Sequence, residues 1–368
     1  MTPSKSCSHS FVADAAAQLG LAAAICITLS SAALAADAEM NPVTGTKYNA
    51  AGDMQAVLTA LAGLGGKPIE TLTPSQARMQ PTVADAVKAV LVAKGMNTDP
   101  MTLVPGVTSK DTSIPGPGGP LPVRVYTPSG AGPFPVVVYF HGGGWVIANK
   151  EVYDGGARGL SKTSHSIVVS VDYRLAPEAK FPAAWDDAFA AYKWVSMNAA
   201  SMNGDPKMLA LAGESAGGNL AVATAVAARD AGVTAPKGVI AVYPVAQTGN
   251  MSTESYVDSA NAKPLNKPMI AWFVDKLLSK PADKMDPRLD LIHAKLNGLP
   301  PVTIINAQID PLRSDGVLLA QALKQAGVKV EHKEYTRVTH EFFGAAAVVS
   351  EAKDAQSFAG EQLGAAFK

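Results

Sequence analysis

The stretch Met208-Leu209-Ala210-Leu211-Ala212-Gly213-Glu214-Ser215-Ala216-Gly217-Gly218 decides the fold. A short apolar run ends in a serine flanked by glycines, and small residues follow, as expected where a strand turns sharply into a helix. On such a turn the serine has strained backbone angles, and its hydroxyl rises above the edge of the sheet. An ordinary glycine-rich turn can show the same five-residue pattern, so the role of Ser215 depends on partners elsewhere in the chain.

The composition is that of a globular protein. The chain has 368 residues, 48% of them hydrophobic, and its 31 basic side chains are balanced by 31 acidic ones. This apolar mass is enough for a large core. Because the charge is balanced and no basic block occurs, nothing in the sequence indicates a nucleic-acid partner, and a small or neutral substrate is expected instead.

The first 35 residues have the pattern of an export signal. Lys5 supplies the early positive charge, an alanine-rich apolar run extends from Leu19 to Leu34, and Ala33-Leu34-Ala35 is a small-residue cleavage site. A membrane anchor is the alternative, but hydroxyl side chains interrupt the run, and a spanning helix needs about 20 strongly apolar residues. We predict a signal peptide cleaved after Ala35, no stable membrane span afterwards, and a periplasmic or secreted protein.

Both cysteines, Cys7 and Cys26, lie in this segment. The cleaved chain therefore has no disulfide, no thiol nucleophile and no cysteine metal site. Neither a metal nor an organic cofactor is expected.

The rest of the chain divides into two predicted regions. Residues 36–102 are expected to form a linker and an N-terminal helical cap element, with helices between Ala51 and Met96. In residues 103–368, short β-rich runs alternate with helical windows, which is typical of a mostly parallel sheet with helices on both faces. Eight strands are predicted, at 102–108, 121–126, 136–140, 167–173, 208–212, 238–245, 302–307 and 328–335. Helices are predicted at 183–198, 216–231, 267–279, 314–325 and 351–367.

Two connections stand out in this pattern. The cluster from Pro115 to Pro122 predicts a turn between the first two strands. Residues 247–297 are too long for an ordinary connection, so we expect an insertion that folds over the sheet.

A serine hydroxyl is a poor nucleophile at neutral pH, so Ser215 needs a base and a carboxylate that orients the base. Of the six histidines, only His340 follows the last predicted strand in a loop, at the edge where ligands bind in open α/β sheets. Asp310 follows the strand 302–307 at the same edge. Asp315 is the rival acid, but it falls in the first turn of the next helix, where the helix dipole alone explains an acidic residue. The order Ser, Asp, His is the one that accompanies a G-x-S-x-G turn.

A second motif, His141-Gly142-Gly143-Gly144-Trp145, follows the apolar strand 136–140. Glycines let the backbone approach a substrate carbonyl and turn its amides toward the developing oxyanion. We therefore expect an oxyanion hole here, and we expect His141 to hold the loop and not to act as the base.

With these motifs the chain resembles the hormone-sensitive-lipase-like (family IV) carboxylesterases, a branch of the α/β-hydrolase fold. The resemblance covers about residues 103–367 and extends to the blocks Asp172 to Glu178, Phe181 to Asp187 and Asp310 to Asp315. It implies an α/β fold with an eight-stranded, mostly parallel sheet, and a helical cap built from 51–96 and 247–297.

The resemblance also implies residue roles. Ser215 would be the nucleophile, His340 the general base and acid, and Asp310 the carboxylate that orients it. The oxyanion hole would use the amides of Gly143, Gly144 and Ala216, with Gly142 sharing that role. Candidates for the wall of an apolar substrate pocket are Trp145, Tyr243, Trp272, Phe273, Phe342 and Phe343.

Some positions have a structural role in this resemblance, and others depart from it. Arg174 and Glu178 are interpreted as scaffold. Glu214 stands where many members have aspartate. Glu341 stands where members often have glycine, so its carboxylate either raises the pKa of the histidine or lies in solvent.

The resemblance implies a serine esterase for small, short-acyl esters, with a small-molecule ester as its partner and a homodimer left open. Two other classes remain. A non-catalytic ligand-binding relative would share the fold, although the presence of Ser215, Asp310 and His340 together argues against it. An amidase or peptidase would use the same chemistry.

Overall fold

The structure, a computed structural model, describes residues 40–368. The predicted signal peptide, its cleavage site and both cysteines lie outside the described residues. Within residues 40–368, no helix has the length and apolar character needed to cross a membrane.

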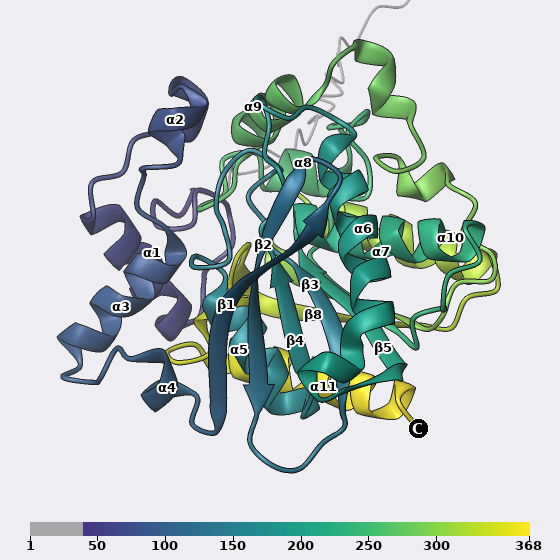
Figure 1. Cartoon of the computed structure of the whole chain (residues 1–368). Coiled ribbons are helices and arrows are strands. Elements are labelled where there is room, and N and C mark those ends of the chain that lie inside the picture. Colours follow the sequence, from purple (N-terminus) through teal and green to yellow (C-terminus); the bar gives the residue numbers. More distant parts are fainter. Residues whose placement is uncertain (1–39) are drawn as a thin grey trace, which may run out of the picture. The chain divides into compact units, whose positions relative to one another are not determined.

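The centre of the fold is an eight-stranded sheet (Figure 1). Its spatial order is β1-β2-β4-β3-β5-β6-β7-β8. The pairs β1/β2 and β2/β4 are antiparallel, and all the others are parallel. The strands are β1 Val107–Gly116, β2 Gly119–Pro128, β3 Phe134–Phe140, β4 Ile167–Val171, β5 Gly204–Glu214, β6 Val239–Val242, β7 Val302–Ile309 and β8 Val330–Thr339. The predicted mostly parallel sheet of eight strands is confirmed.

Helices cover both faces of the sheet, as the continuous apolar strands require. Alternate side chains of a strand point to opposite faces, so Val136 and Val138 of β3 pack in one apolar cluster and Val137 and Tyr139 in the other. The first cluster includes α6 Ala183–Asn198, α7 Ala216–Asp230 and α10 Arg313–Gln325. The second includes α5 Asp154–Ser164 and α11 Ser350–Ala366.

Two parts of the predicted fold differ in the structure. Residues 100–103 form the short helix α4 Pro100–Leu103, which Asp99 caps, and the first strand begins only at Val107. The cluster from Pro115 to Pro122 is not a turn, because β1 and β2 pair through it as far as Gly116 and Gly119. Proline is tolerated there, since β1 is an edge strand and β2 pairs with β4 only from Val123 onward.

Helix α5 is absent from the sequence prediction. Three of its eleven residues are glycine, which is a poor helix former, so the helical pattern is weak. Gly159 is needed for packing, because a β-carbon there would clash with the amide of Gln356 on α11. Close contact with α11 therefore stabilises a helix that local propensity does not favour.

Two segments far apart in the sequence lie together on the carboxyl side of the sheet. The N-terminal segment contains α1 Gly52–Gly63, α2 Pro74–Ala77 and α3 Val83–Ala93, and the later insertion contains α8 Glu254–Asp258 and α9 Lys267–Leu277. Asp258 of the insertion pairs with Lys47 at 2.9 Å and accepts the hydroxyl of Tyr48 at 3.1 Å. Asn266, which caps α9, donates to Glu70 at 3.2 Å. Polar contacts thus join the two segments, which we call the cap.

Candidate active site

Ser215 lies at the junction of β5 and α7. It has φ 57° and ψ −117°, a conformation that is strained for a residue with a side chain. The next strand fixes this turn, because Glu214 pairs with Val242 of β6 and the Ser215 amide donates to the Val242 carbonyl at 2.9 Å. The sheet itself therefore holds the strained serine.

Strand register brings His340 and Asp310 together. Ile309 at the end of β7 pairs with Thr339 at the end of β8, so the residues that follow leave the sheet side by side. Nδ1 of His340 lies 2.6 Å from Oδ2 of Asp310, and Nε2 lies 3.0 Å from Oγ of Ser215. All three side chains are buried. The structure thus joins the three predicted residues in one chain of hydrogen bonds.

The charges around His340 favour its protonated form. Burial alone would lower the pKa of the imidazole, but the charge and hydrogen bond of Asp310, with the charges of Glu341 and Glu214, raise the pKa of His340 above its ordinary 6.5. Asp310 is held in turn, because its Oδ1 accepts the Leu312 amide at 2.8 Å. The imidazole is therefore a stronger base than an ordinary histidine, and its Nε2 can accept the proton of the Ser215 hydroxyl.

Within residues 40–368, no hydrogen bond or ion pair joins Asp315, the rival acid, to His340. Asp315 is fully buried in the first turn of α10, where its Oδ2 accepts the backbone amides of Ala246 at 3.0 Å and Gln247 at 3.3 Å. Burial raises its pKa to about 7. The explanation by the helix dipole alone is therefore incomplete, since Asp315 also anchors the start of the insertion.

The glycine loop follows β3, directly beside the β5 turn, because Phe140 pairs with Gly213. Gly143 has φ +94°, and a β-carbon there would clash with the Ile147 carbonyl. No acceptor in the described part of the chain meets the amides of Gly142, Gly143 or Gly144. The amide of Ala216, the first residue of α7, is also free of helical bonding. These four amides are thus available to a ligand oxygen.

His141 and its neighbours hold this loop from behind. The His141 ring stacks on Tyr173 with ring centroids 4.3 Å apart, and the Tyr173 hydroxyl donates to the His141 carbonyl at 2.8 Å. Arg78, a cap residue that sequence reasoning missed, donates to the Val146 carbonyl at 2.9 Å and pairs with Glu178 at 2.7 Å. Glu178 therefore contributes to the scaffold, and the cap contacts the glycine loop directly.

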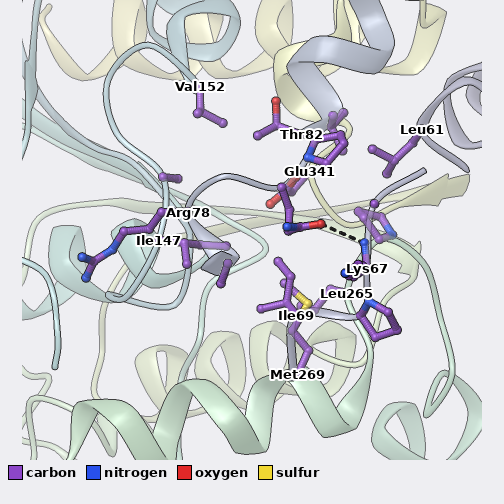
Figure 2. Close-up of a pocket in the computed structure, with 18 of the residues that line it drawn as sticks. Leu61, Lys67, Ile69, Arg78, Thr82, Ile147, Val152, Leu265, Met269 and Glu341 are labelled. Atoms are coloured by element: carbon purple, nitrogen blue, oxygen red, sulfur yellow. Dashed lines mark hydrogen bonds between the residues drawn. The ribbon is translucent and has the colours of Figure 1, made fainter. Parts of the chain in front are cut away.

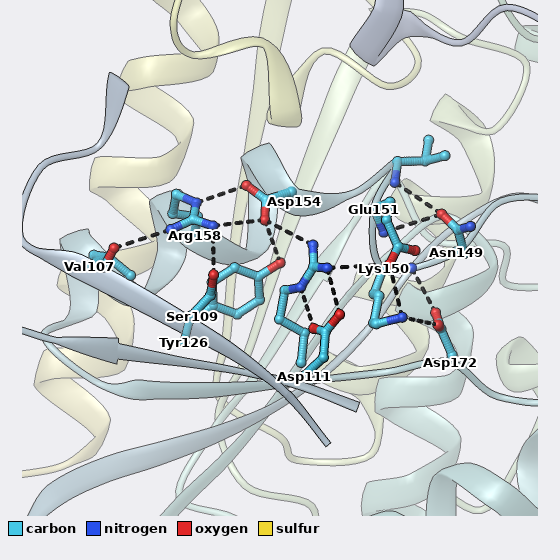
Figure 3. A network of polar contacts seen from close by, with 12 residues as sticks. Val107, Ser109, Asp111, Tyr126, Asn149, Lys150, Glu151, Asp154, Arg158 and Asp172 are labelled. Atoms are coloured by element: carbon cyan, nitrogen blue, oxygen red, sulfur yellow. Dashed lines mark hydrogen bonds and ion pairs between the residues drawn. The ribbon is translucent and has the colours of Figure 1, made fainter. Parts of the chain in front are cut away.

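A polar network holds the segment between the glycine loop and α5 (Figure 3). Lys150 pairs with Asp172 at 2.9 Å, and Arg158 of α5 pairs with Asp154 at 2.8 Å. Arg124 of β2 bridges Glu151 and Asp111. The network holds the loop that precedes α5, which includes Tyr153, whose hydroxyl donates to Glu341.

Two further carboxyl groups lie near the imidazole. Glu214 is buried and accepts hydrogen bonds from the hydroxyls of Tyr139 and Tyr243, and burial raises its pKa to about 7. Glu341 is half-buried and accepts the Tyr153 hydroxyl at 3.2 Å. Burial raises the pKa of Glu341 as well. Glu341 thus raises the pKa of His340 and is not fully in solvent.

Two cavities adjoin these residues. A small apolar one, of about 20 Å³, is lined by Gly144, Trp145, Ser215, Val245, Leu265, Ile270, Phe273, Val274 and Leu312. A large one, of about 920 Å³, lies under the cap and is lined by residues that include His141, Ile147, Leu265, Met269 and Glu341 (Figure 2). Leu265 belongs to both linings, so the cavities adjoin.

The aromatic residues predicted for the pocket separate into two groups. Trp145 and Phe273 line the small cavity. Within the described residues, neither cavity is lined by Tyr243, Trp272, Phe342 or Phe343. Tyr243 instead packs on the His340 ring at 4.4 Å, and Phe342 packs behind Tyr243 at 6.0 Å. Trp272 packs edge-on against Phe273, and Phe343 is in the core.

In residues 40–368, no group of three or more His, Cys, Asp or Glu side chains is arranged to hold a metal ion.

The sheet order and the serine turn at its carboxyl edge define an α/β hydrolase. Comparison with known proteins narrows this class. The family model described as "alpha/beta hydrolase fold" matches residues 137–344. Carboxylesterase NlhH of Mycobacterium tuberculosis is 38% identical over 280 residues, which are 74% of this chain and 88% of the relative. The ethyl acetate hydrolase of Pseudomonas putida is 31% identical over 295 residues, 78% of this chain and 88% of the relative.

Solved structures agree with these relatives. The hyperthermophilic esterase from the archaeon Pyrobaculum calidifontis matches with a TM-score of 0.76 and 36% identity, over 85% of this chain and 96% of that chain. The chain therefore belongs to the hormone-sensitive-lipase-like (family IV) carboxylesterases of the α/β-hydrolase fold. Its activity is carboxylic ester hydrolysis.

Proposed function

We propose that the protein hydrolyses short-acyl esters through Ser215, His340 and Asp310, with an acyl-enzyme intermediate. The observation that carries this proposal is the position of His340, 3.0 Å from the serine oxygen and 2.6 Å from the aspartate. These distances are within the range for proton transfer and for orientation of the imidazole.

The reaction begins when Nε2 of His340 takes the proton of the Ser215 hydroxyl. The serine oxygen bonds to the ester carbonyl carbon, and the carbonyl oxygen becomes an oxyanion that accepts the free amides of the glycine loop and Ala216. Asp310 stabilises the imidazolium and keeps the Nδ1 proton in place. Removing one amide donor from such a site typically costs about 3 kcal/mol of transition-state stabilisation.

The tetrahedral intermediate then loses its alcohol. The bond from carbon to the alcohol oxygen breaks, and His340 gives its proton to the departing oxygen. Water next gives a proton to His340 and attacks the acyl carbon. The second intermediate releases the acid as the serine oxygen recovers its proton, so the enzyme returns to its starting state.

The unequal cavities support a short acyl group and a larger alcohol. A cavity of about 20 Å³ has room for about one water-sized group. Because Ser215 lines this cavity, the acyl chain bound to the serine would enter it. Because His340 gives its proton to the alcohol, the alcohol would extend toward the cavity of about 920 Å³, which His141 and Glu341, the residue after His340, line.

The test is the hydrolysis of 4-nitrophenyl esters from acetate to decanoate by the wild type and by Ser215→Ala. We expect the highest kcat/KM for acetate or propionate, and a loss of at least about 10⁴-fold in kcat for the variant. An unchanged melting temperature would show that the variant is folded. Equal turnover by both proteins would contradict the proposal, and faster cleavage of the matching anilide than of the ester would favour the amidase alternative.

A further inference from the structure

Glu341 differs from the other carboxylates that line the large cavity. Glu178 is paired with Arg78 at 2.7 Å, Asp172 with Lys150 at 2.9 Å, and Glu70 accepts the Asn266 amide at 3.2 Å. Glu341 accepts only the Tyr153 hydroxyl, at Oε1. Within residues 40–368, no hydrogen bond or ion pair engages its Oε2, so a residue that lines the cavity keeps an unused acceptor.

The position of Glu341 is unusual in a second way. It follows His340 directly and has φ +65°, a backbone conformation that glycine adopts more readily. Its side chain lines the large cavity and also a neighbouring cavity of about 420 Å³, and Val152 lines both as well. Figure 2 shows Glu341 among the lining residues of the large cavity, together with Val152 and Thr82 of the cap. A polar, half-buried acceptor is thus placed on the side where the alcohol would lie.

We propose that Glu341 makes the enzyme selective for acetyl-type esters of polyhydroxylated alcohols, by accepting a hydrogen bond from a free hydroxyl of the alcohol portion. This inference rests on the proposed function, because it assumes that the alcohol departs from Ser215 toward His340. An acceptor in a partly desolvated cavity discriminates strongly between esters with and without this hydroxyl. The matching ester that lacks the hydroxyl leaves the acceptor unpaired.

The charge balance of the cavity favours a neutral donor over a cation. The cations Lys67, Arg78 and Lys263 line the same cavity and offset its other three carboxylates. Burial raises the pKa of Glu341, and the charge of His340 opposes this rise. An ammonium group would enter a cavity that these three cations line, so a hydroxyl group suits Glu341 better. The volume of about 920 Å³ accommodates an alcohol as large as a sugar.

The experiment compares two acetates of three-carbon alcohols, glycerol 1-acetate and propyl acetate. The readout is the ratio of their kcat/KM values at a pH above the histidine titration. We expect the wild type to prefer the glycerol ester, Glu341→Leu to lower the ratio about tenfold, and Glu341→Gln, which keeps an acceptor oxygen, to retain most of it. The matched control is Glu361→Leu on the exposed face of α11, which should leave the ratio unchanged.

The ratio separates recognition from catalysis. A change that acts through the pKa of His340 alters kcat/KM equally for both esters and leaves their ratio constant. A constant ratio in Glu341→Leu, or a ratio that Glu341→Leu and Glu341→Gln lower equally, would therefore overturn the inference. A wild-type preference for propyl acetate, or for acetylcholine over both, would also overturn it. If neither acetate is hydrolysed, the result contradicts the proposed function itself. A changed or absent selectivity contradicts only the inference about Glu341.

Discussion

The carboxyl edge of the sheet and the cap above it are built in different ways. At the edge, each functional residue follows a paired strand: Ser215 follows β5, Asp310 follows β7 and His340 follows β8. In the cap, contacts join segments that are distant in the chain, as when Asn266 donates to Glu70. The edge is therefore fixed by strand register, whereas the cap is fixed by individual side-chain contacts. We expect substitutions of these three residues at the edge to change the rate of the chemistry and substitutions in the cap to change the choice of substrate.

The largest effect is expected at Asp310, and the buried Asp315 nearby serves as its comparison. Asp310→Asn should lower kcat by about 10⁴-fold, because an amide lacks the negative charge that fixes the tautomer of the imidazole and stabilises the imidazolium. Asp315→Asn should lower it less than tenfold, since Asp315 contacts the Ala246 and Gln247 amides and not the histidine. Steady-state kinetics with 4-nitrophenyl acetate measures both, and the opposite ranking would exchange the roles of the two residues.

The difference between the edge and the cap explains which features of the molecule could be predicted from the sequence. Ser215, Asp310 and His340 were predictable because parallel strands end at one edge, and a residue just after such a strand needs no further information to be placed there. The glycine loop was predictable for the same reason, since β3 and β5 are neighbours.

The contacts around these residues were not predictable from the sequence. Arg78 and Glu178 are 100 positions apart, and Tyr139 and Glu214 are 75 apart. No local pattern marks such pairs, because a side chain's partner depends on how the cap and the sheet pack together. Tyr243 has the aromatic character expected of a pocket residue, yet its hydroxyl bonds to Glu214 and its ring packs on His340. Its type indicated burial, but only the structure shows what it contacts.

A smaller effect, on selectivity, is expected in the cap. Val274 on α9 lines the small cavity and is buried. Val274→Ala should enlarge the cavity and raise kcat/KM for butyrate relative to acetate by roughly tenfold, because each added methylene is worth about 1 to 3 kcal/mol in an apolar pocket. The comparison uses the 4-nitrophenyl esters of both acids.

Val257 gives the matched control for this change. It lies on α8 in the same insertion but is 65% exposed, so Val257→Ala should leave the ratio of the two esters unaltered. A large loss of kcat for both esters in Val274→Ala would break the distinction between edge and cap, since it would mean that α9 also positions the reacting groups.

The smallest expected effect concerns the pH dependence, which the charged groups of the edge set at one imidazole. His340 must be neutral to take the serine proton, so activity falls as the pH drops through its pKa, and this pKa is raised above 6.5. The groups that face the ring are Asp310, Glu341 and Glu214, with the Ser215 and Tyr243 side chains. We therefore expect the acid limb of kcat/KM to have its midpoint above pH 6.5.

Glu214→Gln tests the origin of that midpoint. The substitution keeps an acceptor for the tyrosine hydroxyls but removes a charge that stabilises the imidazolium, so the midpoint should move to lower pH. The effect is small because burial raises the pKa of Glu214 itself to about 7, which leaves it only partly charged where His340 titrates. The exposed Glu361→Gln should leave the limb in place. A midpoint at or below 6.5 in the wild type would mean that desolvation of the ring outweighs the three carboxylates around it.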